Sequence, residues 1–452
     1  MRSRRKLKTN PRSNHTNLRL TTYDLRSSMT NAPPSILRIA FASFIGTAIE
    51  FYDFYIYGLA VAMVIGPVFF PDSDPAVQAL NAFLTFGIAF VARPIGAMVF
   101  GHFGDKVGRK ATLVISLLVM GSSTMLIGVL PGYELMGWTA PALLCLLRFG
   151  QGIGLGGEWG GAALLAAEHA PEGRRGWFGM FPQLGPPVGF LLAVGSFLLL
   201  AQTLDDAEFR AWGWRIPFLA SAILVGVGLY VRLKLTETPV FARAVKAQQQ
   251  VKFPMQTLLT SYTKPLLLGA LTMVVCYALF YISTVFSLSY GVTTLHIPRP
   301  QFLEMLCVAV LFMAVATPLA AIAGDRFGRR PVLIVAGSAA LLSGFLMEPM
   351  LGSGSPVLIT AFLSIELFLM GATFAPMGAL LPELFPTAVR YTGAGAAYNL
   401  GGILGASLAP FIAQKLVLMG GLAWVGGYIS VAAAISVIAA GMLHETRDRE
   451  LT

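Results

Sequence analysis

The chain has 452 residues, of which 56% are apolar and only 12% are charged, against about 25% in ordinary soluble domains. This composition excludes disordered, collagen-like and disulfide-stapled chains. The formal net charge is +10, and residues 1–35 alone hold eight basic residues and one acidic residue. The excess is therefore local, so it indicates no nucleic-acid partner. It fits either contact with anionic lipid headgroups or a solvated tail.

Apolar runs long enough to cross a bilayer occur twelve times along the chain, since a spanning helix needs about 20 apolar residues. The runs predict helices over residues 37–69, 78–100, 112–131, 140–166, 177–204, 214–233, 265–291, 302–323, 332–351, 357–381, 391–417 and 422–443. The three cysteines lie inside these runs, so the sequence predicts neither a metal site nor a disulfide framework. We expect an all-α polytopic protein embedded in a lipid bilayer.

The longest polar break separates six predicted helices from six more and gives the expected domain organisation. It consists of a basic cytoplasmic tail (1–35), a six-helix bundle (36–233), a central cytoplasmic loop (234–264), a second six-helix bundle (265–444) and a cytoplasmic tail (445–452). With the N-terminus inside, 26 of the 32 Lys and Arg residues fall in cytoplasmic segments. By the positive-inside rule we expect both termini in the cytoplasm.

Two motifs recur in the same order in the two halves. The segment GDKVGRK at 104–110 returns as GDRFGRR at 324–330. The pattern ExxPxxxR at 168–175 returns at 383–390, so both motifs recur at nearly the same spacing. Duplicated six-helix halves are typical of transporters that hold a substrate between the halves, near the bilayer midplane.

At these motifs the chain resembles the major facilitator superfamily, and further segments resemble its metabolite:proton symporter family. Those segments are GTAIEFYDF (46–54), RPIG (93–96), GGEWGG (156–161), WRIPF (214–218) and PELFPT (382–387). The resemblance covers about residues 36–447 and implies twelve transmembrane helices in two pseudo-symmetric six-helix bundles. It also implies transport of shikimate, 2-oxoglutarate, citrate, proline, betaine or a similar metabolite together with protons. Phe51 departs from the family, whose members usually carry Trp there.

Three ionisable residues in the first half are candidates for proton coupling, because charged groups inside a membrane tend to face a cavity and to pair. Glu50 and Asp53 lie at i and i+3 on one face of the first helix, and Arg148 lies in the fourth. A carboxylate beside an arginine stays ionised, whereas one that loses the arginine in a drier cavity takes a proton. The related sugar porters place an aspartate and an arginine in these helices. The alternative is a static ion pair between the two helices.

The best candidate for binding an anionic substrate is Arg93, because a guanidinium can form two parallel hydrogen bonds with a carboxylate. Alternatively, Arg93 could snorkel or bind helix carbonyls. Uncharged candidates for the substrate site are Tyr57, Gln151, Gln183, Tyr277, Tyr281, Tyr398 and Asn399. The tyrosines could instead belong to an aromatic belt. Glu366 is either a second protonatable site or a buried neutral acid.

The repeated motifs predict a cytoplasmic gate in which acids and bases at helix ends bridge the two halves. Its members are Gly104, Asp105, Gly108, Arg109, Glu168, Arg175, Gly324, Asp325, Gly328, Arg329, Glu383 and Arg390. The glycines permit the tight turns that such loops require. The alternative is that these charges only set the topology and cap helices.

Together these features predict a secondary active transporter of the plasma (cell inner) membrane that imports a small organic acid or zwitterion by proton symport. Alternatives are a proton-coupled exporter or facilitator and, outside transport, a membrane sensor. No enzyme is expected, because no nucleophile or metal cluster occurs, and no GxxxxGK[ST] motif for an ATP-driven pump is present. We expect no cofactor other than the coupling ion H⁺, a small carboxylate as substrate, and a monomer.

Overall fold

The computed structural model of the chain describes residues 36–107, 109–156, 159–168, 170–171, 173–234, 254–387 and 389–448. Within these ranges every regular element is a helix. Each bilayer-spanning backbone must satisfy its own hydrogen bonds, and a helix does so within one segment. The all-α prediction is therefore confirmed. The predicted boundaries of the two bundles and of the tails remain predictions, and residues 1–35, 235–253 and 449–452 lie outside the described ranges.

The first half of the chain crosses the bundle six times. Its long elements are α2 (Ile36–Ala60) continued by η1 (Val61–Ile65) and α3 (Gly66–Phe69), α4 (Pro75–Val107), α5 (Arg109–Val129), α7 (Thr139–Gly156) with α8 (Trp159–Glu168), α9 (Arg175–Gln183) with α10 (Gly185–Thr203), and α12 (Ile216–Lys234). The short elements α6 (Tyr133–Met136), α11 (Asp206–Ala211) and η2 (Gly213–Arg215) connect them.

The second half repeats the pattern. Its elements are α14 (Pro254–Ser261), α15 (Thr263–Thr272), α16 (Val274–Tyr281), η3 (Ile282–Phe286) and α17 (Ser287–Thr293), then α18 (Arg299–Phe327), α19 (Arg329–Ser343) with η4 (Gly344–Leu346) and η5 (Met347–Leu351), α20 (Pro356–Phe374) with α21 (Met377–Glu383), α22 (Arg390–Gly402) with η6 (Ile403–Ser407) and α23 (Ala409–Gly420), and α24 (Leu422–Met442).

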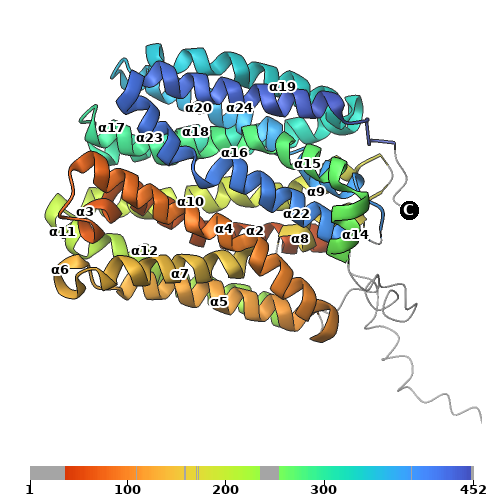
Figure 1. The fold of residues 1–452 in the computed structure, drawn as a ribbon, viewed down its shortest axis with the longest axis horizontal. Helices are drawn as coiled ribbons and strands as arrows, with labels where there is room; N and C mark the ends of the chain where they lie inside the picture. The colour runs from red at the N-terminus through yellow and green to blue at the C-terminus, as the bar shows by residue number, and fades with distance from the viewer. Residues whose placement is uncertain are drawn as a thin grey trace, which may run out of the picture.

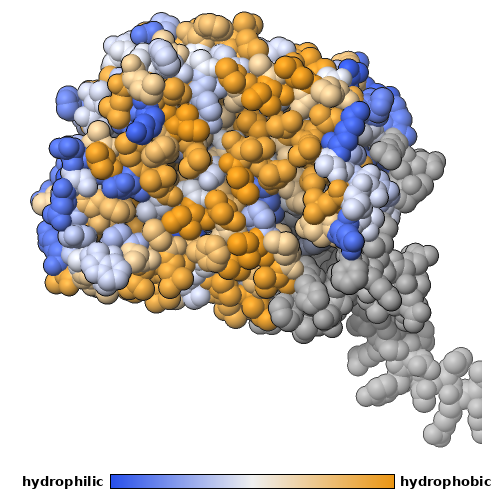
Figure 2. Space-filling view, in the orientation of Figure 1, coloured by the Kyte–Doolittle hydropathy of each residue, from blue (hydrophilic) through white to orange (hydrophobic). Residues whose placement is uncertain are grey.

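Ten of these continuous helical stretches are long and apolar enough to cross a membrane. The third predicted span falls in α5, within which Val114–Val129 is a shorter apolar stretch. The fourth predicted span is α7 with α8, between which residues 157–158 are not described. With these two, the described helices match the twelve predicted spans to within a few residues. Figure 2 shows the expected surface, with apolar residues over the middle of the molecule and hydrophilic residues toward both ends.

The two halves lie side by side, with α4, α5, α7 and α12 in the lower part of Figure 1 and α18, α19, α20 and α24 in the upper part, while α9, α10, α14 and α22 lie between them. We call the end at which α2 begins and α24 ends the proximal end, which the sequence predicts to be cytoplasmic. The other end, with α3, α6, α11 and α17, is the distal end. The halves meet along contacts of α10 with α18, α9 with α18, α22 with α8, and α4 with η6.

Close backbone packing between α4 and α7 positions the centre of the first half. A Cβ atom added to Gly152 would collide with the backbone of Ala89, and one added to Gly156 would collide with the carbonyl oxygen of Arg93. The Gly-x-x-x-Gly spacing predicts such an approach, because small residues let two helix backbones touch. This packing fixes the position from which the Arg93 side chain leaves α4.

We expect Gly152→Ala to lower the midpoint of thermal unfolding in detergent, because the added methyl group must push α4 and α7 apart, at a cost of about 1–3 kcal/mol. Gly226→Ala on α12 is the matched control, since a Cβ there meets nothing within 4 Å. The control should unfold at the wild-type temperature or slightly above it. Equal unfolding temperatures for both variants would contradict this account of the α4–α7 contact.

Candidate functional site: the contact between the two halves

Arg148 on α7 is the centre of a polar cluster inside the first half. It is fully buried. Its Nη1 donates a hydrogen bond to Oε1 of Gln151, and its Nη2 donates to the carbonyl oxygen of Phe86 at 3.2 Å. The guanidinium carbon also lies 3.7 Å from the ring centroid of Tyr57, so the cation is stabilised by a ring face as well as by acceptors.

Gln151 connects this arginine to the first helix. Its Nε2 donates to the backbone carbonyl of Asp53 at 2.9 Å and to Oγ1 of Thr124 at 2.8 Å. The Asp53 side chain is fully buried, and Glu50 is 5% exposed. Arg148 is thus joined to the Asp53 segment through Gln151. The predicted coupling residues therefore lie in adjoining parts of the first half, and their roles in coupling remain predictions.

Arg93 on α4 lies where the two halves meet. It is 2% exposed, and its guanidinium carbon lies 4.4 Å from the ring centroids of both Phe54 and Phe90. Two of its donor nitrogens, Nε and Nη2, have no hydrogen-bond partner among the described residues. The ring faces stabilise the positive charge, but they leave two strong donors available.

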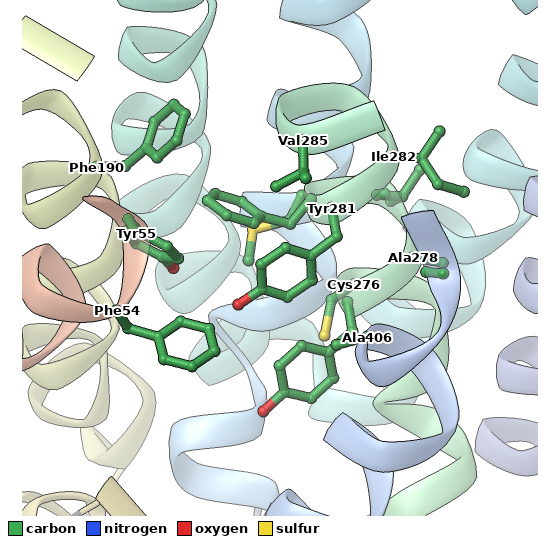
Figure 3. Close-up of a cluster of buried hydrophobic side chains, with 14 of the residues drawn as sticks. Phe54, Tyr55, Phe190, Cys276, Ala278, Tyr281, Ile282, Val285 and Ala406 are labelled. Carbon is green, nitrogen blue, oxygen red and sulfur yellow. The ribbon is translucent and has the colours of Figure 1, made fainter. Parts of the chain in front are cut away.

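Tyrosines from the second half complete the environment of Arg93. The ring of Phe90 lies 5.5 Å from Tyr281 and 6.4 Å from Tyr277, and Tyr277 lies 5.7 Å from Tyr398. In Figure 3, Phe54 and Tyr55 on one side and Tyr281 on the other extend into the space between the halves. We call Arg93, Phe54, Phe90, Tyr277, Tyr281 and Tyr398 the central cluster.

Two further predicted residues cross between the halves beside the central cluster. Gln183 accepts a hydrogen bond from Nε1 of Trp159 at 3.1 Å and donates to the carbonyl of Phe374 at 2.9 Å. Asn399 Nδ2 donates to the carbonyl of Gly156 at 3.3 Å. Trp159 itself stacks on Tyr398 with ring centroids 3.9 Å apart.

The predicted uncharged residues therefore divide into two groups. Tyr57 and Gln151 lie in the Arg148 cluster of the first half, where the Tyr57 hydroxyl is 2.5 Å from Oγ1 of Thr85. The others, Gln183, Tyr277, Tyr281, Tyr398 and Asn399, lie at the contact between the halves. Sequence reasoning did not select Trp159 for this surface, although the GGEWGG segment contains it.

The proximal end is closed by Asp325 at the end of α18. Its two carboxylate oxygens accept hydrogen bonds from the backbone nitrogens of Gly176 and Trp177, each at 2.8 Å. These nitrogens belong to the first turn of α9, where an anion is favoured. Arg329 pairs with the same carboxylate at 2.8 Å. Asp325 thus contacts the other half, and its role in a cytoplasmic gate remains a prediction.

Glu383 extends the same network. It is fully buried and pairs with Arg329 at 3.3 Å and, across the halves, with Arg175 at 3.8 Å. Arg390 donates from Nε to the carbonyl of Phe385 at 3.1 Å. The corresponding residues of the first half cannot be compared in the same way. Gly108 lies outside the described residues. The structure does not describe the side chains of residues 101–113 and 167–168, which include Gly104, Asp105, Arg109 and Glu168.

The C-terminal segment binds this network through Glu445 and Thr446, contacts that the sequence did not predict. We call these contacts the Glu445 clamp. Glu445 accepts hydrogen bonds from the backbone nitrogens of Arg329 and Arg330 at 2.9 and 3.0 Å. Its carboxylate occupies the space where a Cβ of Gly328 would lie, and Gly328 has φ +103°, a region that favours glycine. Thr446 Oγ1 donates to Glu383 at 2.6 Å. The only sequence signal was an acid followed by a threonine just after the last span.

The distal end is closed by a different set of residues. Arg299 at the start of α18 pairs with Asp206 of α11 at 3.1 Å, and its guanidinium carbon lies 4.2 Å from the ring centroid of Phe209. Nearby, Gln202 Nε2 donates to Glu304 at 3.1 Å. Both contacts join the halves. Sequence reasoning used Arg299 only to assign topology, because the partner lies in a distant loop of the other half.

We expect the two closures to act on opposite sides of the central cluster. Cys276 is fully buried on α16 beside the cluster (Figure 3) and can report accessibility in a Cys145→Ser, Cys307→Ser background. Asp325→Asn should raise its labelling rate by a charged thiol reagent about tenfold from the proximal side, since hydrogen bonds to a buried charge contribute roughly 1.5–3 kcal/mol.

Asp206→Asn should raise labelling from the distal side by only about two- to fivefold, because the Asp206 side chain is 78% exposed and exposed ion pairs contribute roughly 0.2–1 kcal/mol. Each variant is the control for the other. If both variants increased labelling from the same side, the assignment of the two closures would be wrong.

The Glu445 clamp predicts a pH-dependent contribution to stability. Burial opposes ionisation, but hydrogen bonds from the backbone nitrogens of Arg329, Arg447, Arg330 and Thr446 hold the pKa of Glu445 below its ordinary value of 4.5. A carboxyl whose pKa is lower in the folded state stabilises the fold above the unfolded pKa, and this stabilisation disappears as the pH falls through the folded pKa.

We therefore expect Glu445→Gln to unfold at a lower temperature than wild type at every pH above about 5, with the difference shrinking below pH 4.5. Thermal scans in detergent across this range measure it. Asp448→Asn, whose side chain is 78% exposed, is the control and should differ little from wild type. A difference that grows on acidification would have the wrong sign for the clamp.

Comparison with known proteins agrees with this geometry. The family model described as "Sugar (and other) transporter" matches residues 39–258 and again residues 244–451. The inner membrane metabolite transport protein YhjE of Escherichia coli (strain K12) is 54% identical over 92% of this chain and 95% of its own length. The shikimate transporter of the same organism is 36% identical over 91% of this chain and 95% of its own.

A solved structure has the same fold. The partially occluded, inward-open conformation of the xylose transporter XylE from E. coli aligns with a TM-score of 0.72 at 18% identity, covering 92% of this chain and 99% of that chain. These relatives are transporters and not enzymes, as the sequence predicted. The chain is therefore a multi-pass membrane protein that belongs to the sugar (and other) transporter family of the major facilitator superfamily.

Proposed function

We propose that the chain imports a small organic acid or zwitterionic metabolite by proton symport, with Arg93 binding the carboxylate group of the substrate. The observation that carries this proposal is the pair of unpartnered donors on a buried guanidinium at the contact between the halves. A buried charge without acceptors costs several kcal/mol. A carboxylate would offer two acceptor oxygens in the geometry of the guanidinium fork.

The names of two relatives support a carboxylate. The shikimate transporter and the proline/betaine transporter of E. coli, the latter 33% identical over 91% of this chain, are named for compounds that each carry a carboxylate. Tyr277, whose buried hydroxyl forms no hydrogen bond of normal geometry with the described residues although Tyr398 lies beside it, could bind a second polar group of such a substrate. The surrounding rings favour a compact molecule with an apolar or cationic body.

Proton coupling is proposed for the first half, where Glu50 and Asp53 are buried on α2 and the backbone carbonyl of Asp53 accepts a hydrogen bond from Gln151, the partner of Arg148. Protonation of a carboxyl there would change the charge of α2, and Gln151 connects α2 to Arg148 on α7. Closures at both ends of one central cluster support alternating access, since each can open while the other holds.

The remaining parts of the proposal concern the setting of the protein. The protein lies in the inner membrane of the cell with both termini in the cytoplasm, because the basic residues of the loops are distributed asymmetrically. The protein acts as a monomer without a nucleic-acid partner, and protons are the only coupling species required. A proton-coupled exporter is the competing function, and the direction of transport separates the two.

Uptake into proteoliposomes tests the proposal. We expect accumulation of labelled 2-oxoglutarate, shikimate, citrate, proline or betaine when the pH gradient is directed inward, and loss of accumulation with a protonophore. Arg93→Lys should reduce substrate affinity at least tenfold, because lysine keeps the charge but loses the planar fork. Arg210→Lys on exposed α11 is the matched control and should transport normally.

Two outcomes would contradict specific parts of the proposal. Sodium-dependent uptake that resists a protonophore would exclude proton symport. Normal affinity in Arg93→Lys would remove Arg93 from the substrate site.

Asp53→Asn should abolish accumulation but permit counterflow, since counterflow exchanges labelled for unlabelled substrate without net proton movement. If Glu50→Gln has this effect and Asp53→Asn does not, the coupling role belongs to Glu50.

A further inference from the structure

Glu366 is a carboxyl group buried in the second half, outside the central cluster. It lies on α20, ten residues after Pro356 and seventeen before Glu383, or about 15 and 25 Å along the helix axis. The residue is fully buried, and neither carboxyl oxygen has a hydrogen-bond partner among the described residues. A charged group so deep in a membrane helix is costly and is a functional candidate by default.

The helices packed against α20 bring no charge to Glu366. These neighbours are chiefly α18, α16 and α19, with η3, η5 and α21 beside them. Their described titratable groups are Cys276, Tyr277, Tyr281, Arg299, Glu304, Cys307, Asp325, Arg326, Arg329, Arg330, Glu348 and Glu383. Among the described residues, Ser343 at the end of α19 is the polar side chain beside the carboxyl, and no hydrogen bond of normal geometry joins the two.

The Ser343 hydroxyl shows which protonation state fits this site. It lies 2.9 Å from the carbonyl oxygen of Ala340, and while it donates its proton there it can offer Glu366 only lone pairs. A carboxylate has no proton to donate to those lone pairs, whereas a carboxylic acid has one. An ionised Glu366 would also be an uncompensated buried charge. The arrangement therefore fits a neutral, protonated Glu366.

The internal repeat shows which residue of the first half occupies the position that matches Glu366. The spacing that relates the two ExxPxxxR motifs places Glu366 opposite Gln151, and the spacing that relates GDKVGRK to GDRFGRR places Ser343 opposite Ser123. Gln151 ties α7 to Thr124 of α5 and to the Asp53 carbonyl of α2. A protonated glutamic acid has nearly the shape of glutamine but offers one hydrogen-bond donor where the amide of Gln151 offers two. Deprotonation removes that donor.

We propose that Glu366 is a proton-binding site of the second half, protonated in the closed state described here and deprotonated when α19 and α20 separate and water enters. The end of α19 favours such movement, because Ser343 is followed by the 3₁₀ turn η4 and the π-turn η5, and π-turns inside helices are frequent at functional sites. Its part in coupling rests on the proposed proton symport, whereas proton binding itself does not.

Infrared difference spectroscopy of the protein in lipid nanodiscs tests proton binding directly. We expect a carbonyl band of a protonated carboxylic acid at neutral pH that disappears reversibly at alkaline pH and is lost in Glu366→Gln. Glu366→Asp should retain a titrating band. Glu348→Gln, on exposed η5 in the same half, is the matched control and should leave the band unchanged. A wild-type spectrum whose band is unaffected by Glu366→Gln would overturn the proposal.

The pH profile of counterflow separates a titrating site from a static neutral acid. Glu366→Gln should support counterflow within twofold of wild type at neutral pH, since it imitates the protonated form. It should lose the wild-type decline at alkaline pH, where Asp53→Asn still declines. A Glu366→Gln profile identical to wild type would show that the proton is never released. Thermal unfolding confirms that each variant is folded before it is compared.

The two proposals can fail separately. If uptake resists a protonophore, proton symport is wrong, but the Glu366 band can still titrate. If uptake is proton-coupled and the Glu366 band does not titrate or is absent, then only the assignment of this second site is wrong.

Discussion

Two buried guanidinium groups constrain how the helices of the first half are arranged. Arg148 is fully buried and Arg93 is 2% exposed, and each would cost several kcal/mol in an apolar medium without compensation. The protein compensates Arg148 within one half, through Gln151, the Phe86 carbonyl and the Tyr57 ring. Among the described residues Arg93 receives ring faces but leaves Nε and Nη2 without an acceptor, whereas Arg148 leaves only Nε without one. The first arginine is therefore suited to hold helices together, and the second to bind something else.

The closures at the two ends differ in how strongly water competes with them. At the proximal end, Asp325 has a side chain 14% exposed and binds two backbone nitrogens and Arg329. At the distal end, the Asp206 side chain is 78% exposed and its partner Arg299 is 5% exposed. Because solvent weakens exposed ion pairs more than buried ones, distal opening should need less free energy than proximal opening. The residues of the central cluster between them are each at most 4% exposed.

The sequence could predict the fold because its signals are local or repeated. Apolar run length determined the twelve spans, and the two recurring motifs indicated duplicated halves. Asp325 and Glu383 were found because their motif positions place them at helix ends. Trp159, Asp206 and Glu445 were missed, since their partners lie in distant segments and only packing brings them together. Tyr57 was placed with the substrate candidates because its helix face is shared with Asp53, whereas the fold turns it toward Arg148.

The two halves use the same framework with different side chains in the core. The spacing that relates Gln151 to Glu366 also relates Arg148 to Leu363, which is fully buried. The first half therefore keeps a permanent cation at this level, held by a glutamine, while the second half has Leu363 in place of the cation and an acid in place of the glutamine. A neutral Glu366 is consistent with that absence, since an anion there would have no partner. If the proposal for Glu366 holds, divergence of the repeat at this one pair of positions separates a glutamine that joins helices at any pH from an acid whose hydrogen bonding depends on a proton.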